Sequence, residues 1–262
     1  MTDTLQYALL LPIIVGIFVG PTAGYLGSIM ISKRMALVGD ALSHVALPGL
    51  AIGLLLNFNP FIGAFTFLVA VMIATWYLQK STVLPIETII GVLFVLALAV
   101  GLLITPETEL LHALFGDIST ITPLDTAITG VIALFTVLVT RLIYRDMAMS
   151  MISKEMALSM GVKVERINLI YLILVATVVA IGIKEVGTIL VGAVVIVPAA
   201  AARNISRNLR NYALFSAFFG GFSAVIGVVI SYFSGVPAGP LVVISGVVVF
   251  VIAFFIGKGH WR

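Results

Sequence analysis

The chain has 262 residues, of which 61% are hydrophobic and only 10% are charged, with a formal net charge of +3. Charged residues make up about 25% of an ordinary globular domain, so this composition excludes a soluble protein. The apolar runs are long and unbroken, which excludes a transmembrane barrel built from alternating strands. We therefore predict one all-α, polytopic membrane domain over residues 1–262.

About nine apolar segments follow one another along the chain, most of them roughly long enough for a helix to cross a bilayer. They cover residues 5–31, 35–56, 60–78, 86–104, 124–143, 167–183, 186–202, 212–233 and 239–257. The seventh is short and contains Pro198, so the number of spans is eight if residues 186–202 do not cross fully. In the first segment Gly16, Gly20 and Gly24 recur every four residues, a spacing typical of close helix packing.

An ionisable pair, Asp40 and His44, lies inside the second apolar segment. Such side chains within a membrane span cost roughly several kcal/mol unless they face a cavity, a partner or an ion. On a helix, residues four apart share one face about 6 Å apart along the axis. The pair could therefore present one oxygen and one nitrogen to a metal ion, with Ser43 close to that face.

Pro48 follows the pair and has no N–H to give to the carbonyl of His44. That oxygen could bind water, allow a kink or act as a third ligand. A structural explanation is also open, in which Asp40 caps a helix that begins there and His44 bonds to a neighbouring helix. The chain has no cysteine, so a metal site must use O and N ligands, which suit manganese, iron or zinc better than copper(I).

Other polar residues could line a pathway. Glu87 begins the fourth segment, where either the helix dipole or a role in the pathway explains a carboxylate. His112 lies among acids in the loop between the fourth and fifth segments, a pattern that favours a solvated acidic loop over a metal site. Lys184 and Glu185 interrupt a long uncharged stretch, and they could pair at the outer surface or form a gate.

The only long polar segment covers residues 145–166. Within it, SKEMALSMGVKVERIN predicts a short helix, a stop at Gly161 and the start of the next span. Met156 and Leu158 would expose apolar surface to water, which is costly unless it is covered. A soluble partner subunit would cover it, and an amphipathic helix on the membrane surface is the alternative.

The basic residues predict the orientation of the chain. With nine alternating spans and the N-terminus outside, all of the 14 Lys and Arg residues except Lys184 fall on the inner side. Positive residues mark cytoplasmic loops. We therefore expect the N-terminus outside and the C-terminus in the cytoplasm.

Five stretches of the chain resemble the ABC-type metal permeases, the membrane subunits of bacterial zinc and manganese importers. They read SKRMALVGDALSHVALPGLAIG, ETIIGVLF, LLHALFGDI, SKEMALSMGVKVERIN and VGTILVGAVVIVPAAAARNI. The resemblance covers nearly the whole chain from Gly20 to the final span. It implies a type II ABC importer-like fold in the plasma membrane of a prokaryote.

The resemblance also implies roles for particular residues. Asp40 and His44 match the metal-pathway pair of the family, and Ser43 and Glu87 are further candidates for the pathway. The ATPase-contacting region is matched by a set in the polar segment: Ser153, Lys154, Glu155, Met156, Leu158 and Gly161. The implied partners are a separate ABC ATPase, an extracytoplasmic metal-binding protein and a second copy of the permease. Zinc, manganese or iron would be the substrate, and no permanently bound cofactor is expected.

The function classes can be narrowed further. The chain has no GxxxxGK(S/T) loop, so it does not hydrolyse ATP by that route, and we expect a transport permease rather than an enzyme. A secondary transporter driven by protons or sodium, with Asp40 and His44 relaying protons, is the alternative. An intramembrane metalloprotease is disfavoured, because the chain's 3 scattered histidines do not form an HExxH-type ligand set.

Overall fold

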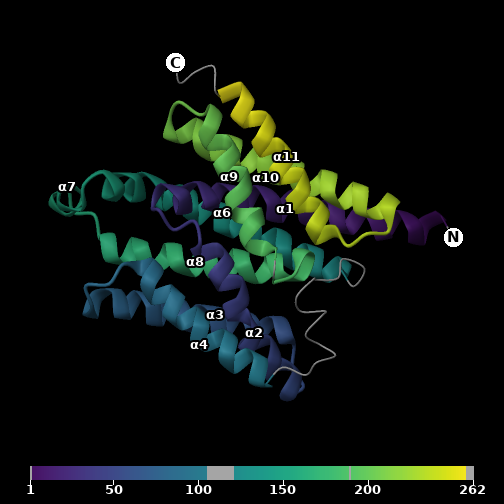
Figure 1. Ribbon diagram of the computed structural model, residues 1–262, viewed down its shortest axis with the longest axis horizontal. Coiled ribbons are helices and arrows are strands. Elements are labelled where there is room, and N and C mark those ends of the chain that lie inside the picture. Colours follow the sequence, from purple (N-terminus) through teal and green to yellow (C-terminus); the bar gives the residue numbers. More distant parts are fainter. Residues whose placement is uncertain (1, 105–120, 189, 258–262) are drawn as a thin grey trace.

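The computed structural model describes residues 2–104, 121–188 and 190–257, without the side chains of residues 2–8 and 184–186. Within these ranges every regular element is a helix (Figure 1). The helices are α1 (Thr2–Ser32), α2 (Val38–Leu55), α3 (Pro60–Ser81), α4 (Ile86–Ile104), α6 (Pro123–Ile152), α7 (Lys154–Ser159), α8 (Val164–Val186), α9 (Val191–Ile205), α10 (Leu209–Ser234) and α11 (Ala238–Gly257). The predicted all-α fold is confirmed.

Eight of the described helices are long and apolar enough to cross a membrane. Helix α9 has only 15 residues, about 22 Å at 1.5 Å per residue, and falls short of a ~30 Å hydrocarbon core. It is short because Gly187, with φ +80°, ends α8, and helix resumes only at Val191. The described chain therefore contains eight candidate spans, the smaller of the two predicted numbers.

Helix α9 nevertheless returns the chain to the end of the bundle where α10 begins. Arg203, near the end of α9, lines one pocket with Ser32 at the end of α1, Ile152 at the end of α6 and Leu209 at the start of α10. These four positions lie at one end of the bundle, and the N-terminus of α1 lies at the other (Figure 1). The short helix α9 thus returns the chain to the same end as a full span would, so the direction of α10 and α11 is unchanged.

Helix α6 is longer than the sequence predicts. We expect the fifth span to end near residue 143, whereas α6 runs to Ile152 and has 30 residues, about 45 Å. No glycine or proline interrupts residues 144–152, Met147 is fully buried, and the Tyr144 hydroxyl donates to the Leu209 carbonyl at 2.8 Å. The polar segment is therefore built from the end of α6, helix α7 and the start of α8.

Helix α1 packs against α10 and α9 almost backbone to backbone. A Cβ atom placed on Gly24 would lie 2.1 Å from the carbonyl oxygen of Ser216 in α10. One placed on Gly27 would lie 2.0 Å from the carbonyl oxygen of Val195 in α9. The predicted close packing of the glycine face is confirmed at Gly24, and α1 contacts α6 and α8 as well.

Helices α2, α3 and α4 pack on one another along the lower side of the bundle in Figure 1. Helix α2 contacts α9 as well as α8, and one tie of these three helices to the rest lies at the end rich in basic residues. Lys80 of α3 forms an ion pair with Glu165 of α8 at 2.5 Å, and the Trp76 indole N–H donates to the Glu165 carbonyl at 2.9 Å. At the same end Lys33 donates to the Asn168 side chain, and burial lowers the pKa of Lys33 to about 8. Helix α8 therefore holds the two parts of the bundle together.

Replacing Gly24 with alanine should destabilise the folded chain, because the new methyl group meets backbone that cannot rotate away. Overpacking lowers the free energy of unfolding by about 1–3 kcal/mol. Because the methyl group meets backbone and not a flexible side chain, we expect the upper part of that range. The measurement is the midpoint of thermal unfolding of the purified protein. The control is Gly91→Ala in α4, where a Cβ meets nothing within 4 Å. Equal midpoints for Gly24→Ala and the wild type would contradict the close contact.

Candidate metal pathway

Asp40 lies in the first turn of α2, but it does not cap the helix. The N-cap residue is Leu37, which makes no side-chain capping hydrogen bond. The Asp40 side chain is exposed, and its backbone carbonyl accepts a hydrogen bond from Ser43 Oγ at 2.6 Å. The helix begins before Asp40, so the capping explanation for this residue is wrong.

His44 lies one turn further along α2 and is half-buried. Its Nδ1 atom is buried and has no hydrogen-bond partner among the described residues. The imidazole ring stands 5.7 Å from the ring of Phe94 in α4, measured between centroids. A buried polar atom without a partner is rare in native structures. His44 thus offers a ring nitrogen that the described protein does not use.

Ser43 and Pro48 occupy different settings on the same helix. Ser43 is fully buried and spends its hydroxyl proton on the Asp40 carbonyl, so it points at the backbone and not at the ionisable pair. Helix α2 continues through Pro48, whose ring packs on α4: a Cβ on Gly101 would lie 3.2 Å from Pro48 Cδ. Helix α4 therefore closes one side of the pair.

The start of α9 packs against the pair at Gly192, which is not among the predicted site residues. A Cβ atom on Gly192 would lie 2.5 Å from Asp40 Cα and 2.6 Å from its nitrogen. Gly39 is close to the same residue, with 3.7 Å from its own added Cβ to Gly192 Cα. In the sequence, the one signal for this contact is Gly192 itself, a small residue within the apolar stretch before Pro198. Gly192 therefore lets α9 approach the Asp40 backbone closely.

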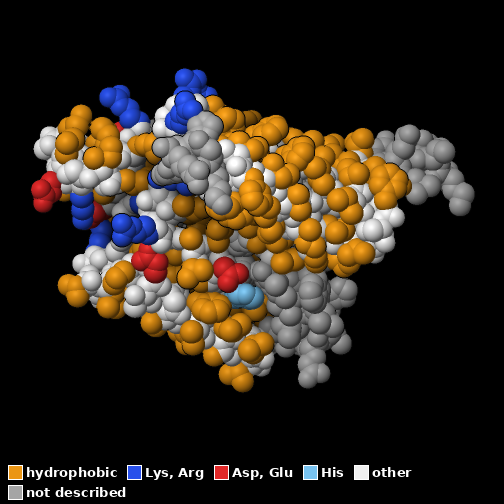
Figure 2. All heavy atoms as spheres, turned by 45° about the horizontal axis from the view of Figure 1, so that its top comes forward, with side chains coloured by type: hydrophobic (Ala, Val, Ile, Leu, Met, Phe, Trp, Pro, Cys, Tyr) orange, Lys and Arg blue, Asp and Glu red, His pale blue; other side chains and the backbone are white. Residues whose placement is uncertain are grey.

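The pair lies within the apolar middle of the protein. Figure 2 shows Lys and Arg side chains gathered toward one end, whereas a histidine and an acidic side chain lie together in the orange middle of this face. His44 is the only histidine among the described residues. An ionisable group in such surroundings is expensive and marks a functional site by default.

The other predicted pathway residues are not brought to this pair. Glu87 lies in the first turn of α4, seven residues before Phe94 and thus about 10 Å away along the axis. The side chains of Lys184 and Glu185 lie outside the described residues, and so does the loop that contains His112. Within the described ranges no three His, Asp or Glu side chains gather closely enough to hold a metal ion.

The predicted short helix in the polar segment is present as α7, which lies at one extremity of the molecule (Figure 1). Ser153 caps it, because its side chain accepts a hydrogen bond from the Met156 N–H at 3.2 Å. Ala157 is fully buried against the neighbouring helices. Gly161, with φ +80°, ends the turn, so the predicted stop is confirmed.

The outer face of α7 is apolar. Met156, Leu158 and Met160 are 55%, 51% and 59% exposed, and Lys154 and Glu155 beside them are exposed as well. Apolar side chains grouped on a protruding helix mark a contact surface. The apolar coupling residues Met156 and Leu158 are therefore exposed, and their contact with a partner stays a prediction.

Comparison with known proteins agrees along the whole chain. The sequence pattern of the ABC 3 transport family matches residues 2–257. The manganese import system permease protein ScaB of Streptococcus gordonii is 33% identical over 256 residues, which cover 96% of this chain and 91% of the relative. The high-affinity zinc uptake system membrane protein ZnuB of Haemophilus influenzae is 30% identical, with 97% of this chain and 98% of the relative covered.

A solved structure extends the agreement to the fold. PsaBC from Streptococcus pneumoniae, in complex with Fab, superposes with a TM-score of 0.85 at 31% sequence identity, over 97% of this chain and 94% of that one. The match includes the helices that carry the ionisable pair and those that flank α7. On sequence and fold together, the chain belongs to the ABC 3 transport family.

Proposed function

We propose that this chain is the membrane-spanning permease subunit of an ABC importer, and that a divalent transition metal ion passes the Asp40 and His44 pair. The observation that carries the proposal is an exposed carboxylate one turn from an imidazole with an unpartnered nitrogen, in the apolar middle of a bundle. Carboxylate oxygen and imidazole nitrogen bind both manganese and zinc, the metals named for ScaB and ZnuB. Iron would fit the same ligands.

The exposure of Asp40 supports a site shared by two copies of the chain. A carboxylate that lies at mid-bundle and yet is exposed among the described residues would meet water or a second protein surface. In a two-fold dimer both pairs would face the same path, and together they would offer two oxygens and two nitrogens. Four such ligands satisfy a tetrahedral zinc ion, and water can complete a larger shell for manganese.

The helices around the pair favour the passage of a metal ion over its tight binding. Gly192 and Phe94 bound the pair on two sides with small or apolar groups, which add no further ligand. A permeating ion must be bound firmly enough to enter and weakly enough to leave.

The energy for transport would come from an ABC ATPase subunit seated on the exposed apolar face of α7. The basic residues support a cytoplasmic location for that end of the bundle, because positive residues favour the inner side of the membrane. They are Lys33, Arg34, Lys80, Arg141, Arg145, Lys154, Lys163, Arg166, Arg203, Arg207 and Arg210. An extracytoplasmic metal-binding protein would deliver the ion at the opposite end, where α1 begins.

The pair itself is tested by Asp40→Asn and His44→Leu. Each keeps approximate side-chain volume and removes one ligand, so metal uptake should fall at least about tenfold while the protein remains in the membrane. Asp40→Glu keeps the charge but moves the carboxylate outward by one methylene, and it should reduce uptake or change metal preference. The measurement is accumulation of radioactive manganese or zinc by cells that depend on this transporter.

Ser43→Ala is the matched control, because the Ser43 hydroxyl is bonded to the backbone and lies one residue from His44. It should retain nearly full uptake. Normal uptake in both Asp40→Asn and His44→Leu would refute the proposed pathway. We would then turn to Glu87 and to Lys184 with Glu185.

The approach of α9 is tested by Gly192→Ala. Its methyl group would meet Asp40 backbone at 2.5 Å, so α2 must shift and the carboxylate with it. A displacement near 1 Å at a functional site can cost about 10²-fold in rate, and we expect uptake to fall by about that factor. Thermal unfolding of the same sample and the uptake of Gly91→Ala separate this effect from general damage. Uptake equal to that of Gly91→Ala would show that α9 does not position Asp40.

The coupling surface is tested by Leu158→Asp, which places a charge in the centre of the exposed apolar face of α7. Binding of the ATPase subunit, measured by co-purification, should be lost while membrane insertion is unchanged. The control is Thr82→Asp, which adds the same charge at an exposed position beyond the end of α3. Retained ATPase binding in Leu158→Asp would refute the coupling role. Metal uptake that persists after the ATPase is lost would instead favour a secondary transporter.

A further inference from the structure

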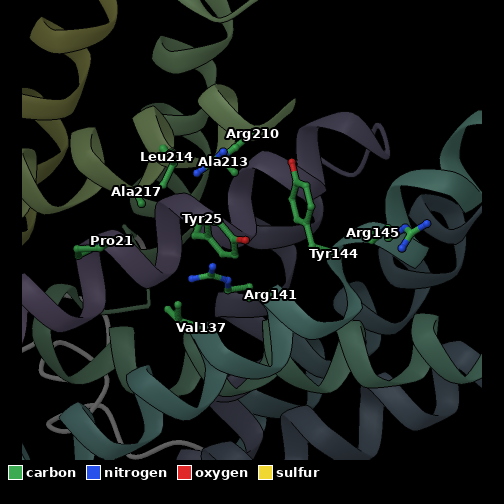
Figure 3. A pocket seen from close by; sticks show the side chains of 10 residues that line it. All are labelled: Pro21, Tyr25, Val137, Arg141, Tyr144, Arg145, Arg210, Ala213, Leu214 and Ala217. Carbon is green, nitrogen blue, oxygen red and sulfur yellow. The ribbon is translucent and has the colours of Figure 1, made fainter. Parts of the chain in front are cut away.

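A pocket of about 520 Å³ opens between α1, α6 and α10, helices that do not carry the ionisable pair. Its volume lies within the ~300–1,000 Å³ range of small-molecule sites. The lining combines basic, aromatic and apolar side chains, among them Arg141, Arg210, Tyr25, Tyr144, Val137 and Leu214 (Figure 3).

The arginines of this pocket carry positive charge that nothing in the described chain neutralises. Arg141, Arg145 and Arg210 are exposed, and none of them forms an ion pair with a carboxylate of the described residues. Figure 3 shows Arg141 and Arg210 on either side of Tyr25, with Arg145 beyond Tyr144. Two guanidinium groups therefore flank one space, where an anion would meet charge-assisted hydrogen bonds.

The two tyrosines form the aromatic part of the lining. Their rings stack with centroids 5.9 Å apart, and Tyr144 is held by the hydrogen bond from its hydroxyl to the Leu209 carbonyl. The Tyr25 hydroxyl takes part in no hydrogen bond among the described residues. It is therefore a further donor beside the two guanidinium groups.

The lining changes from basic to apolar with depth along the helices. Helix α6 ends, and α10 begins, at the basic end of the bundle, so residues earlier in α6 and later in α10 lie deeper. On α6, Val137 lies one turn deeper than Arg141, and on α10, Leu214 lies one turn deeper than Arg210. Pro21 of α1 adds to the deeper, apolar part. The pocket is therefore an open groove that is basic toward the end of the bundle where α10 begins and apolar further along the helices.

We propose that this pocket binds an anionic phospholipid, with Arg141, Arg210 and Tyr25 on the headgroup phosphate and an acyl chain against Val137 and Leu214. Basic pockets between membrane-spanning helices on the cytoplasmic side are suited to anionic headgroups. A soluble phosphate could use the arginines but would make no contact with the apolar wall, whereas a phospholipid contacts both parts of the lining. The inference goes beyond the proposed transport function, and it uses the proposed orientation only to assign the cytoplasmic leaflet.

The test is a titration of the purified full-length chain with phosphatidylglycerol and with phosphatidylcholine, read by native mass spectrometry without metal or ATPase. The wild type should bind phosphatidylglycerol more tightly. The double variant Arg141→Gln with Arg210→Gln should weaken that binding by about tenfold or more, because both charge-assisted contacts to the headgroup phosphate are lost. Both changes are at exposed positions, so the fold should be retained.

Two further variants separate the pocket from general charge. Arg207→Gln removes an exposed arginine that does not line the pocket, and it should bind phosphatidylglycerol as the wild type does. Val137→Trp fills the apolar part of the groove while keeping every charge, and it should weaken binding. Excess glycerol 3-phosphate should fail to displace the lipid.

The proposal is overturned by any of three results. Unchanged binding in the double arginine variant would remove the headgroup contact. Equal loss in Arg207→Gln would reduce the effect to net charge. Displacement by glycerol 3-phosphate, together with normal binding in Val137→Trp, would identify a soluble phosphate compound as the ligand instead.

Discussion

The close contact of α1 with its neighbours is the constraint on which the rest of the structure depends. Lipid tails are as apolar as leucine, so helices in a membrane associate mainly through packing and hydrogen bonds. Gly24 and Gly27 let the backbones of α10 and α9 approach α1 directly. Once α9 is held there, its first turn reaches α2, and Gly192 comes to lie against Asp40. Small residues thus link the central helix to the ionisable pair.

That arrangement leaves the ionisable pair in apolar surroundings, where such groups are costly. Asp40 is exposed at mid-bundle, and His44 has a buried nitrogen that finds no partner in the described part of the chain. Groups of this kind cost free energy unless water, an ion or a second protein surface meets them. Within the proposed function, the passing metal and the second copy of the chain supply what the single chain lacks.

The basic end of the bundle combines two different surfaces. The apolar face of α7 protrudes there, and α7 leads directly into α8, which contacts α2, α3 and α9. A subunit bound to α7 would therefore touch an element continuous with the helices around the pair. The arginine-lined pocket lies on other helices of the same end, so the proposed lipid site and the proposed ATPase surface are separate.

Most of the helices could be predicted from the sequence because each depends on local chemistry. Apolar runs set the spans, Pro and Gly set several boundaries, and the short helix with its stop at Gly161 follows from residues close together in the chain. The position of Asp40 and His44 on one face also follows from helix geometry. The C-terminal end of α6 does not follow from local chemistry, because burial of Met147 and the Tyr144 hydrogen bond extend the helix.

What only the tertiary structure decided are the contacts between segments far apart in the chain. The sequence by itself determined the membrane class, the all-α fold and the ionisable pair, since composition and spacing suffice for these. It did not place Gly192 against Asp40, Phe94 beside His44 or Arg210 near Arg141. Those neighbours depend on how rigid helices cross, and a helix periodicity specifies a face but not the helix that will cover it.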